Sequence, residues 1–576
     1  MLRSTVSAVA AAAILSLVAP ACSDDPAAPA GSDDPATPGV ALARSTALPA
    51  GGRCAFGGTE LAVGEDLDHD GTLDDNEIQR RSVSCFDPSL VRVDPEPAGD
   101  HCASGGKAVR QGLDRNHDGQ LADDEVASTT YACDPAAVFS GDFTAEMWSD
   151  PAAVAALVGA EVITGNLEVA GPSAVPLPRL TVVGGTLSVA SQLDGSTTLE
   201  VPALAIVGGT LDLAHQGLSG AIALPQLHRV GGAVRIAQAE VTALSAPVLT
   251  QVSGLVIDGT RIEHLALPAL TDAGPFLGLQ NNPALIDLAL PALHQVIELV
   301  VLHDDALTAL AGLDNLARAT NVTIADNAAM AEAALPALEG LTNLTISGPV
   351  LTAIEFPRIS FAGTVVIHDV PALEQVTLPS LLQANHIDAM AAPKLARLDL
   401  PVLNTLFGQR FSPTLSIALR VIGTAIDELS LPLLTMSGGR IEATLNPNLR
   451  AIDLPTLRVV DRIISEGNFR LTAISAPALV SATTISLVHS PIATLALGKL
   501  TTVVADLQIG DAALATLDGL GALQTVGGGL ALVDNTQLAS LAGLAKLSSV
   551  RGTVRIDRCP ALSPDDIAAL VARVHP

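Results

Sequence analysis

The sequence predicts a mainly β protein in which a long parallel β-solenoid follows two small cysteine-bounded modules. Three observations predict this fold. An aliphatic unit recurs every 21–24 residues from about residue 160, with prolines such as Pro178, Pro202 and Pro225 marking the period, and such a period is typical of solenoids. The chain is 49% hydrophobic but only 2% aromatic, which favours a repetitive core of small aliphatic residues. Residues 54–85 and 102–133 are two copies of one segment that begins and ends with cysteine.

The first 21 residues have the features of a signal peptide. Arg3 supplies an early positive charge, and residues 6–19 form the apolar stretch, which is too short for a membrane span. The segment ends in Ala19-Pro20-Ala21-Cys22 and resembles a bacterial lipoprotein signal. That resemblance implies lipidation at Cys22, export, and an anchor in the bacterial cell envelope at the outer membrane or cell surface. Ordinary secretion with an unmodified Cys22 is the alternative.

Residues 22–50 are rich in Asp, Pro, Ala and Gly. Such a segment buries too little apolar surface to fold, so we expect a disordered tether. The whole chain carries a net charge of −30. Nucleic-acid binding by counterion release needs basic stripes, and the sequence has none, so no nucleic-acid partner is expected. Membrane attachment is expected only through the lipid.

Each cysteine-bounded segment contains the pattern D-x-[DN]-x-[DN]-G-x5-E without a gap, which is the EF-hand calcium loop. Positions 1, 3 and 5 of that loop supply side-chain oxygens, position 7 a backbone carbonyl, position 9 often a water-mediated contact and position 12 a bidentate Glu. Gly71 and Gly119 occupy position 6, where the turn is sharp. The predicted Ca²⁺ ligands are Asp66, Asp68, Asp70, Thr72, Asp74 and Glu77 in the first loop, and Asp114, Asn116, Asp118, Gln120 and Glu125 in the second.

Electrostatics also favours a cation in these loops. Two carboxylates about 4 Å apart repel by roughly 4 kcal/mol at an effective dielectric near 20, so crowded acids need a counterion. Calcium suits the loop better than magnesium, which demands a tighter octahedron. The second loop has Asn116 in place of an aspartate and Ala122 at position 9, so weaker binding is expected there. A solvated acidic turn that mimics the motif is the alternative interpretation.

We expect module 1 at residues 51–90 and module 2 at residues 98–137. Cys54 and Cys85 are 31 residues apart, as are Cys102 and Cys133, which favours pairing within each module in an oxidising compartment, although other pairings remain open. A strand around residues 59–64 precedes the first loop, so the modules are not paired-helix units. They resemble small cysteine-bounded repeats of exported bacterial proteins, and a structural rather than a sensing role for calcium follows.

The solenoid is expected over residues 140–576. Its consensus is roughly L-x-L-P-x-L-x-x-V-G-G-x-L-x-I, with about seventeen units; those near Gly312, Gly498, Gly519 and Gly543 lack the proline. The Gly-Gly pairs are interpreted as tight corners, and the long gap between Pro401 and Pro432 predicts an inserted loop at 407–413. Asp150-Pro151 and Ser563-Pro564 begin helical patterns, which predict a capping helix at each end.

Several units carry asparagine after the second strand residue, as in Leu277-x-Leu279-x-x-Asn282, Val322-x-Ile324-x-x-Asn327 and Leu530-x-Leu532-x-x-Asn535, while Cys559 stands at the same place in the last unit. These units resemble leucine-rich repeats, and more closely their receptor L-domain-like variant. The resemblance implies a buried side chain at this position that bonds the turn backbone, and a structural thiol at Cys559.

The sequence has no HExxH, GxSxG, P-loop or GxGxxG motif. The expected function is therefore a non-enzymatic, lipid-anchored surface protein with structural calcium sites and a solenoid scaffold for binding or adhesion to an unknown protein or glycan. A parallel β-helix enzyme acting on polysaccharide and a purely structural envelope spacer are the alternatives. An ordered patch of Arg, His and aromatic residues on one solenoid face would favour binding, and a featureless face would favour the spacer.

Overall fold

The computed structural model of the chain describes residues 40–48, 58–66, 75–76, 78–85, 89–102, 105–115, 120–133, 137–170, 176–189, 198–214, 217–410 and 416–574. The signal peptide, Cys22 and the tether up to residue 39 lie outside these ranges. Residues 40–48, expected in the tether, instead form strand β1 (Val40–Leu48). This strand contains no Asp, Pro or Gly, so the tether composition that we extended to residue 50 in fact ends at Gly39.

The chain divides into two compact units, one of residues 1–88 with 114–120 and the other of residues 89–113 with 121–576. The first unit contains an antiparallel sheet of β1, β2 (Gly58–Asp66) and β3 (Ile78–Cys85). The predicted strand at 59–64 lies within β2. The second unit contains the equivalent sheet of β4 (Ser89–Glu96), β5 (Gly106–Leu113) and β6 (Val126–Ala132), followed by the solenoid. Each module therefore begins with a strand that lies entirely before its expected boundary.

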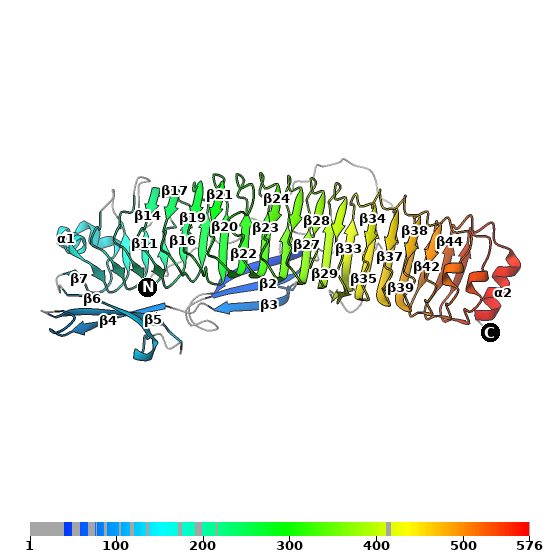
Figure 1. Cartoon of the computed structure of the whole chain (residues 1–576), viewed down its shortest axis with the longest axis horizontal. Helices are drawn as coiled ribbons and strands as arrows, with labels where there is room; N and C mark the ends of the chain where they lie inside the picture. The colour runs from blue at the N-terminus through cyan, green and yellow to red at the C-terminus, as the bar shows by residue number, and fades with distance from the viewer. Residues whose placement is uncertain are drawn as a thin grey trace, which may run out of the picture. The chain divides into compact units, whose positions relative to one another are not determined.

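The predicted fold class is confirmed: the chain is mainly β and forms a parallel solenoid of about 18 turns. Its long sheet is built from the strands of successive coils, and some coils contribute more than one strand (Figure 1). In the first coils the strand is split by a corner, which gives a separate five-stranded sheet of β7 (Val138–Phe139), β8 (Val162–Ile163), β10 (Val182–Val183), β12 (Ile206–Val207) and β15 (Arg229–Val230).

The other strands of the long sheet follow in chain order. They are β9 (Leu167–Val169), β11 (Leu187–Val189), β13 (Leu211–Asp212), β16 (Val234–Ala237), β18 (Leu255–Asp258), β20 (Phe276–Gln280), β22 (Gln295–Leu302), β23 (Arg318–Ala325), β25 (Gly340–Ile346), β27 (Phe361–Ile367), β29 (Gln383–Met390), β31 (Thr405–Leu406), β32 (Gln409–Arg410), β33 (Ser416–Ile422), β35 (Met436–Thr444), β37 (Val459–Glu466), β39 (Ser481–Val488), β41 (Thr502–Val503), β42 (Leu507–Gly510), β43 (Thr525–Val526), β44 (Leu530–Val533), β45 (Ser549–Val550) and β46 (Val554–Asp557).

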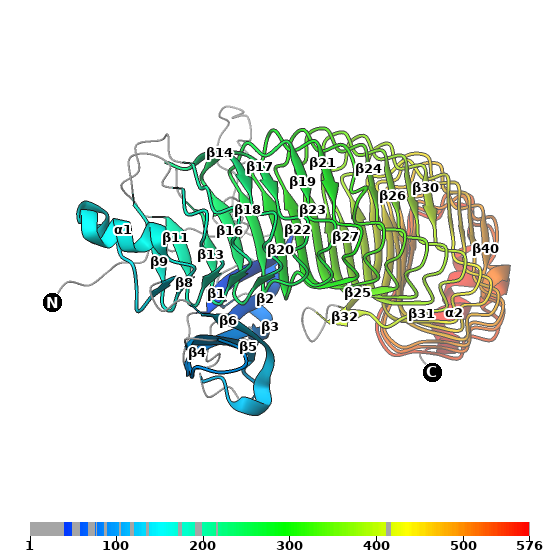
Figure 2. The same cartoon turned by 60° about the vertical axis from the view of Figure 1, so that its left-hand side comes forward.

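A second side of many coils forms short parallel strands, which belong to three separate sheets (Figure 2). The first sheet is β14 (Ser219–Ala223), β17 (Glu240–Ser245), β19 (His264–Ala266) and β21 (Asp287–Ala289). The second is β24 (Glu332–Ala334), β26 (Ala353–Glu355), β28 (Gln375–Thr377) and β30 (Arg397–Asp399). The third is β34 (Glu428–Ser430), β36 (Ala451–Asp453), β38 (Ala473–Ser475) and β40 (Thr494–Ala496).

The recurring L-P-x-L sequence is a turn with proline at its second position. In Val201-Pro202-Ala203-Leu204 the Leu204 amide donates to the Val201 carbonyl at 3.1 Å, and both apolar residues are fully buried. Proline presets the backbone angle that this position of the turn requires. The proline therefore bends the coil while the two flanking side chains anchor the bend in the core.

Of the units without proline, the one with Gly498 keeps its second-side strand, β40, whereas those with Gly312, Gly519 and Gly543 have a tight turn in its place. Coils with Gly519 and Gly543 carry the 3₁₀ turns η4 (Asp518–Leu520) and η5 (Ala542–Leu544), and the coil with Gly312 (φ +105°) separates β21 from β24. A Cβ at Gly519 would lie 1.6 Å from the Leu495 carbonyl oxygen of the preceding coil. Glycine is required here because neighbouring backbones approach too closely for any side chain.

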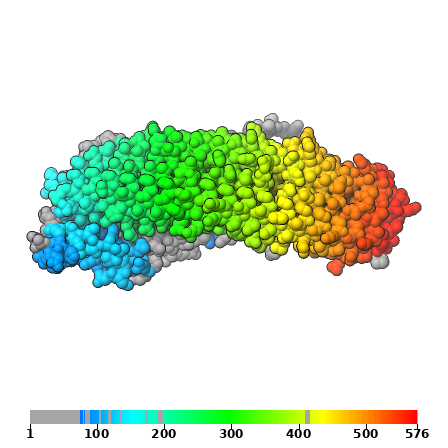
Figure 3. Space-filling model, in the orientation of Figure 1, coloured from blue at the N-terminus to red at the C-terminus, as the bar shows by residue number. Residues whose placement is uncertain are grey.

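Both capping helices are confirmed, and they lie at opposite ends of the stack (Figure 1). They are α1 (Pro151–Gly159), where the Asp150 carboxylate accepts from the Ala152 amide at 2.9 Å, and α2 (Pro564–Val574). The 3₁₀ helix η3 (Ala145–Ser149) precedes α1. Leu157 of α1 and Leu570 of α2 are buried in the same continuous core as the coils between them. In the space-filling view the coil colours follow one another from cyan to red, as expected if each coil contacts only its neighbours (Figure 3).

Candidate functional site

The structure describes only part of the predicted calcium ligands. Asp68, Asp70, Thr72, Asp74, Glu77, Asn116 and Asp118 lie outside the described residues, and Asp66 is described only as the last residue of β2. Gln120 is exposed, while Asp114 is 1% and Glu125 is 4% exposed. The donor set consists of oxygen atoms only, which fits calcium. Within the described ranges no group of three or more His, Cys, Asp or Glu is placed to hold a metal, so the calcium sites stay a prediction.

Glu125 also caps the turn that closes the second loop. It ends the 3₁₀ helix η1 (Asp123–Glu125), and its Oε2 accepts from the Ala122 amide at 2.9 Å. Arg92 of β4 binds the same turn, because it donates to the Leu121 carbonyl and pairs with Asp123. The hydrogen bond to Asp123 is the main reason that the pKa of Arg92 is raised. The end of the second loop is therefore fastened to its module.

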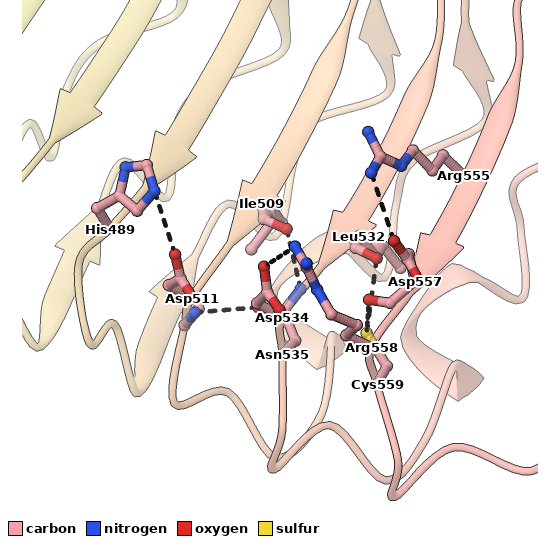
Figure 4. Close-up of polar contacts among 11 residues, drawn as sticks. His489, Ile509, Asp511, Leu532, Asp534, Asn535, Arg555, Asp557, Arg558 and Cys559 are labelled. Carbon is pink, nitrogen blue, oxygen red and sulfur yellow. Dashed lines mark hydrogen bonds and ion pairs between the residues drawn. The ribbon is translucent and has the colours of Figure 1, made fainter.

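The Cys102–Cys133 disulfide is present in module 2. The predicted Cys54–Cys85 bond cannot be compared with the structure, because Cys54 lies outside the described residues. Cys559 is a free, buried thiol whose Sγ lies 3.5 Å from the Leu532 carbonyl oxygen (Figure 4). It occupies the asparagine position of its coil and is buried there, as expected, while its structural role stays a prediction.

The asparagine position forms a buried column, and the sequence prediction found only part of it. Asn282, Asn327 and Asn535 each donate through Nδ2 to a carbonyl of the preceding coil at 2.9–3.1 Å. Asn446 and Asn468, which we missed, do the same. Their signal was present, because Ile441-x-Ala443-x-x-Asn446 matches the pattern. Each column residue follows one with a left-handed backbone, such as Asn281 or Leu445 (φ 55° each).

The sheet of module 2 packs against the first coils of the solenoid. Val109 and Ala132 of the module form one buried apolar cluster with Val162, Val182 and Ile206 of the solenoid. These solenoid residues alternate along their strands with core residues, so they lie on the outer face of the sheet. They are nevertheless only 2–4% exposed. Module 2 is therefore a lateral cover of the first coils as well as a loop carrier.

The covered residues belong to one column of outward-pointing positions, which we name the first outer column. Strand register defines it as Val138, Val162, Val182, Ile206, Arg229, Gln251, Asp272, Gln295, Arg318, Gly340, Phe361, Gln383, Thr405, Met436, Val459, Ser481, Thr502, Thr525 and Ser549. Large apolar residues occur in it twice. The later set, Phe361, Met436 and Val459, is 41–48% exposed, and Leu382, Phe407 and Val480 nearby are 44–45% exposed.

A second outer column carries a concentrated group of charges beside that exposed set. Its members at β29, β33 and β35 are Asp388, Arg420 and Glu442, in register on adjacent strands. The preceding positions Val300, Thr323, Thr345 and Val366 and the following positions Ile464, Ser486 and Gln508 are all uncharged. We name Asp388, Arg420 and Glu442, with His386, Arg440 and Arg462 beside them, the charged block.

Internal ion pairs hold the charged block together. Arg420 donates to Asp388 Oδ2 through Nε at 2.9 Å and through Nη2, and Arg440 Nη2 lies 2.9 Å from Glu442 Oε2. Burial lowers the pKa of Arg440. The side chains of Arg420 and Asp388 are 4% and 2% exposed, whereas that of Arg462 is 31% exposed. The rim of the block, rather than its centre, can therefore meet a ligand.

The insertion in the solenoid falls at the same coil. Between β31 and β33 the chain leaves the sheet, and β32 turns back to pair antiparallel with β33. The loop expected at 407–413 is thus confirmed in place, although residues 411–415 lie outside the described ranges. Insertions in repeat proteins often mark the binding face.

The charged block was not predicted from the sequence because its members are 2–32 positions apart. Aligning the units on their strands brings these members together.

Comparisons with known proteins add little to this picture. The model of the domain of unknown function DUF7151 matches twice, at residues 41–85 and 88–133, which are the two modules. Among solved structures, the TLR13–ssRNA13 complex matches with 12% identity over 68% of this chain and 81% of that chain, at a TM-score of 0.16. No curated protein matches. Among the described helices none is long and apolar enough to cross a membrane.

Proposed function

We propose that the protein is a non-enzymatic, exported scaffold, anchored by lipid at Cys22 in the bacterial envelope, whose solenoid binds or adheres to a protein or glycan. Its two modules bind calcium structurally through the loops at 66–77 and 114–125. The observation that supports the binding part most is the charged block. It gathers Arg, His and carboxylate side chains on a column whose other positions from Val300 to Gln508 are uncharged, beside exposed Phe361 and Phe407 and next to the insertion.

This arrangement favours binding over the spacer. A spacer needs stacked coils only, and nothing in stacking requires charge to be concentrated on three adjacent strands. Neutral residues in place of Asp388, Arg420 and Glu442 would avoid the desolvation cost of burying charges in a low-dielectric region. Ordered patches with apolar and arginine side chains are typical of protein interfaces.

The arrangement gives less support to a polysaccharide-acting enzyme. Such an enzyme needs a pair of carboxylates that both reach the substrate. Here the Asp388 side chain is 2% exposed and engaged by Arg420, and that of Glu442 is 13% exposed and paired with Arg440. We therefore propose that these carboxylates orient the arginines of a recognition surface.

A binding screen with matched variants tests the proposal. Full-length protein is applied to a glycan array and to immobilised envelope proteins, and compared with Arg440→Ala/Arg462→Ala. Arg555→Ala is the matched control, because Arg555 occupies the second outer column outside the block and is exposed. Loss of binding in the double variant but not in the control is expected. Ligands bound equally by all three proteins would place the recognition surface elsewhere.

A further inference from the structure

The buried asparagine column has one position where a carboxyl group replaces the amide. Between Asn282 and Asn327 the chain carries Asp304, which is 0% exposed. Its Oδ1 accepts from the backbone amide and from Nδ2 of Asn282, both at 2.9 Å. Its own amide donates to Asn327 Oδ1 at 2.9 Å. Asp304 is therefore a full member of the column.

The second carboxyl oxygen of Asp304 lacks the hydrogen bond that the side-chain nitrogens of the neighbouring column asparagines make to a backbone carbonyl. Asn282 and Asn327 donate through Nδ2 to the carbonyls of Ile257 and Val301. Strand register places Leu279 between these two residues, so its carbonyl is the equivalent acceptor for position 304. Asp304 Oδ2 is buried without a hydrogen-bond partner. A carboxylate has no proton to donate there, whereas a protonated carboxyl has one acceptor oxygen and one donor, as an amide has.

The charged groups that surround Asp304 do not favour its ionised form. Asp258, from the coil before the preceding one, and the adjacent Asp305 both act on it as like charges. His303 precedes it in the chain, and within the described residues no cationic side chain forms an ion pair with Asp304. Burial is the main reason that the pKa of Asp304 is raised, to about 7.

The same coil contains a second buried carboxyl group. Glu298 of β22 is 9% exposed, and burial raises its pKa to about 7. Its strand neighbours in register are Phe276 and Asn321, which are uncharged. This coil also lacks the second-side strand, since Gly312 lies where the sheet is interrupted between β21 and β24. Two buried titratable groups therefore belong to one coil, and that coil has no second-side strand.

We propose that residues 295–316 form an acid-tightened joint of the solenoid, in which the neutral carboxyl group of Asp304 stands in for asparagine and its ionisation loosens the coil. On protonation, Oδ2 gains the proton that it donates toward the Leu279 carbonyl. On ionisation that proton leaves to solvent and the charge stays buried. Loosening means more frequent local opening of this coil, while the coils on either side keep their packing.

The pH dependence follows from linkage. A carboxyl group whose pKa is higher in the closed coil than in the open one favours the closed coil at low pH, and this stabilisation is lost as pH rises through the closed-state value. With pKa values of 3.8 and about 7 for Asp304, the opening equilibrium rises by up to about tenfold per pH unit between roughly pH 4 and 7 and then levels off.

Hydrogen exchange with peptide resolution on the full-length protein tests the joint. Exchange is measured from pH 5 to 8 and corrected for the intrinsic rate of each amide. In the wild type, opening of residues 295–316 should rise by tenfold or more per pH unit up to pH 7, because Asp304 and Glu298 each contribute up to about tenfold, while the coil around Asn446 should not respond. Asp304→Asn should remove the contribution of Asp304 without loss of folding, because Asn is the residue present at 282 and 327. Glu298→Gln in addition should remove the remainder.

The reverse exchange supplies a matched gain of function. Asn446 is buried, donates to the Val421 carbonyl and accepts from the Thr424 amide, so Asn446→Asp should transfer the pH response to its own coil. A wild-type coil 295–316 with the same pH profile as the control coil would overturn the proposal. So would an Asp304→Asn protein that keeps the full response.

Discussion

One column of the long sheet contains two apolar stretches, the second interrupted by Gln383 and Thr405, that occupy the same outward position but have different surroundings. Val162, Val182 and Ile206 are 2–4% exposed, because the β4–β6 sheet covers them. Phe361, Met436 and Val459 are 41–48% exposed. Between the stretches the column is polar, from Arg229 to Arg318. The first stretch contributes to folding, and the second presents apolar surface to solvent.

The residues of module 2 that pack on the first apolar stretch can be compared with the residues at the equivalent positions of module 1. By strand register Val91, Val93, Val109 and Ala132 of module 2 correspond to Ala43, Ser45, Leu61 and Ser84 of module 1. The same family model matches both modules, so they share a framework. The second module has three valines and an alanine at these positions, where the sequence of the first has two serines, and apolar area is what stabilises packing.

The largest expected effect is from charge in the covered stretch. Val182→Asp would bury a carboxylate among valines without a partner, and should destabilise the first coils by about 3 kcal/mol or more. Urea unfolding followed by the fluorescence of Trp148, the single tryptophan, measures this, since Trp148 packs on Phe143 in the first coils. Met436→Asp is the matched substitution in the exposed stretch. An equal loss of unfolding free energy in that variant would contradict the difference between the covered and the exposed stretch.

Loss of the disulfide should be the next largest effect. The Cys102–Cys133 bond closes a loop with a sequence separation of 31, and such a loop is stabilised by roughly 3 kcal/mol in the chain-entropy model. Cys102→Ser/Cys133→Ser should therefore make β4–β6 the first segment cut in limited proteolysis at elevated temperature. The strands around Met436 should keep their wild-type resistance. Cleavage of both regions at the same rate would contradict a separate role for the module.

Calcium removal should have a smaller effect. With an extracellular-type dissociation constant of about 10⁻⁴–10⁻³ M, about 1 mM Ca²⁺ stabilises the folded state by roughly 0.4–1.4 kcal/mol. We expect chelation to lower the unfolding temperature reported by Trp148, and Glu125→Gln to remove that shift. Glu77→Gln in the first loop is the matched control. A shift that persists in Glu125→Gln would mean that the second loop is not its source.

The exposed stretch should matter least for stability. Met436→Ser/Val459→Ser removes side chains that are 42% and 48% exposed, so unfolding should change by about 0.5 kcal/mol or less. Binding to any partner found in the screen should weaken measurably in the same protein. Unchanged binding would show that the second stretch is ordinary surface.

The sequence predicted the features that repeat with a fixed spacing. Proline turns, capping helices, the insertion and part of the asparagine column follow from local patterns that recur at a fixed period. The strand β1 was missed because an averaged composition concealed nine residues without Asp, Pro or Gly. Asn446 and Asn468 were missed because Ala443 and Ser465 weaken the aliphatic pattern of their units.

The candidate surface could not be predicted in the same way. Asp388, Arg420 and Glu442 become neighbours only through the register of β29, β33 and β35, and the insertion makes one interval 32 residues long rather than 22. The covering of Val182 and Ile206 depends on contacts between segments about a hundred residues apart in sequence. Neither the strand register nor such long-range contacts can be read from a single unit.

Hydroxyl-radical footprinting of the native full-length protein tests the central contrast most directly, because it measures the solvent access of individual side chains. We expect rapid labelling of Phe361, Phe407 and Met436 and strong protection of Val109, Val182 and Ile206. Labelling of Val182 and Ile206 as fast as Met436 would contradict this expectation, since the module would then leave the first coils uncovered.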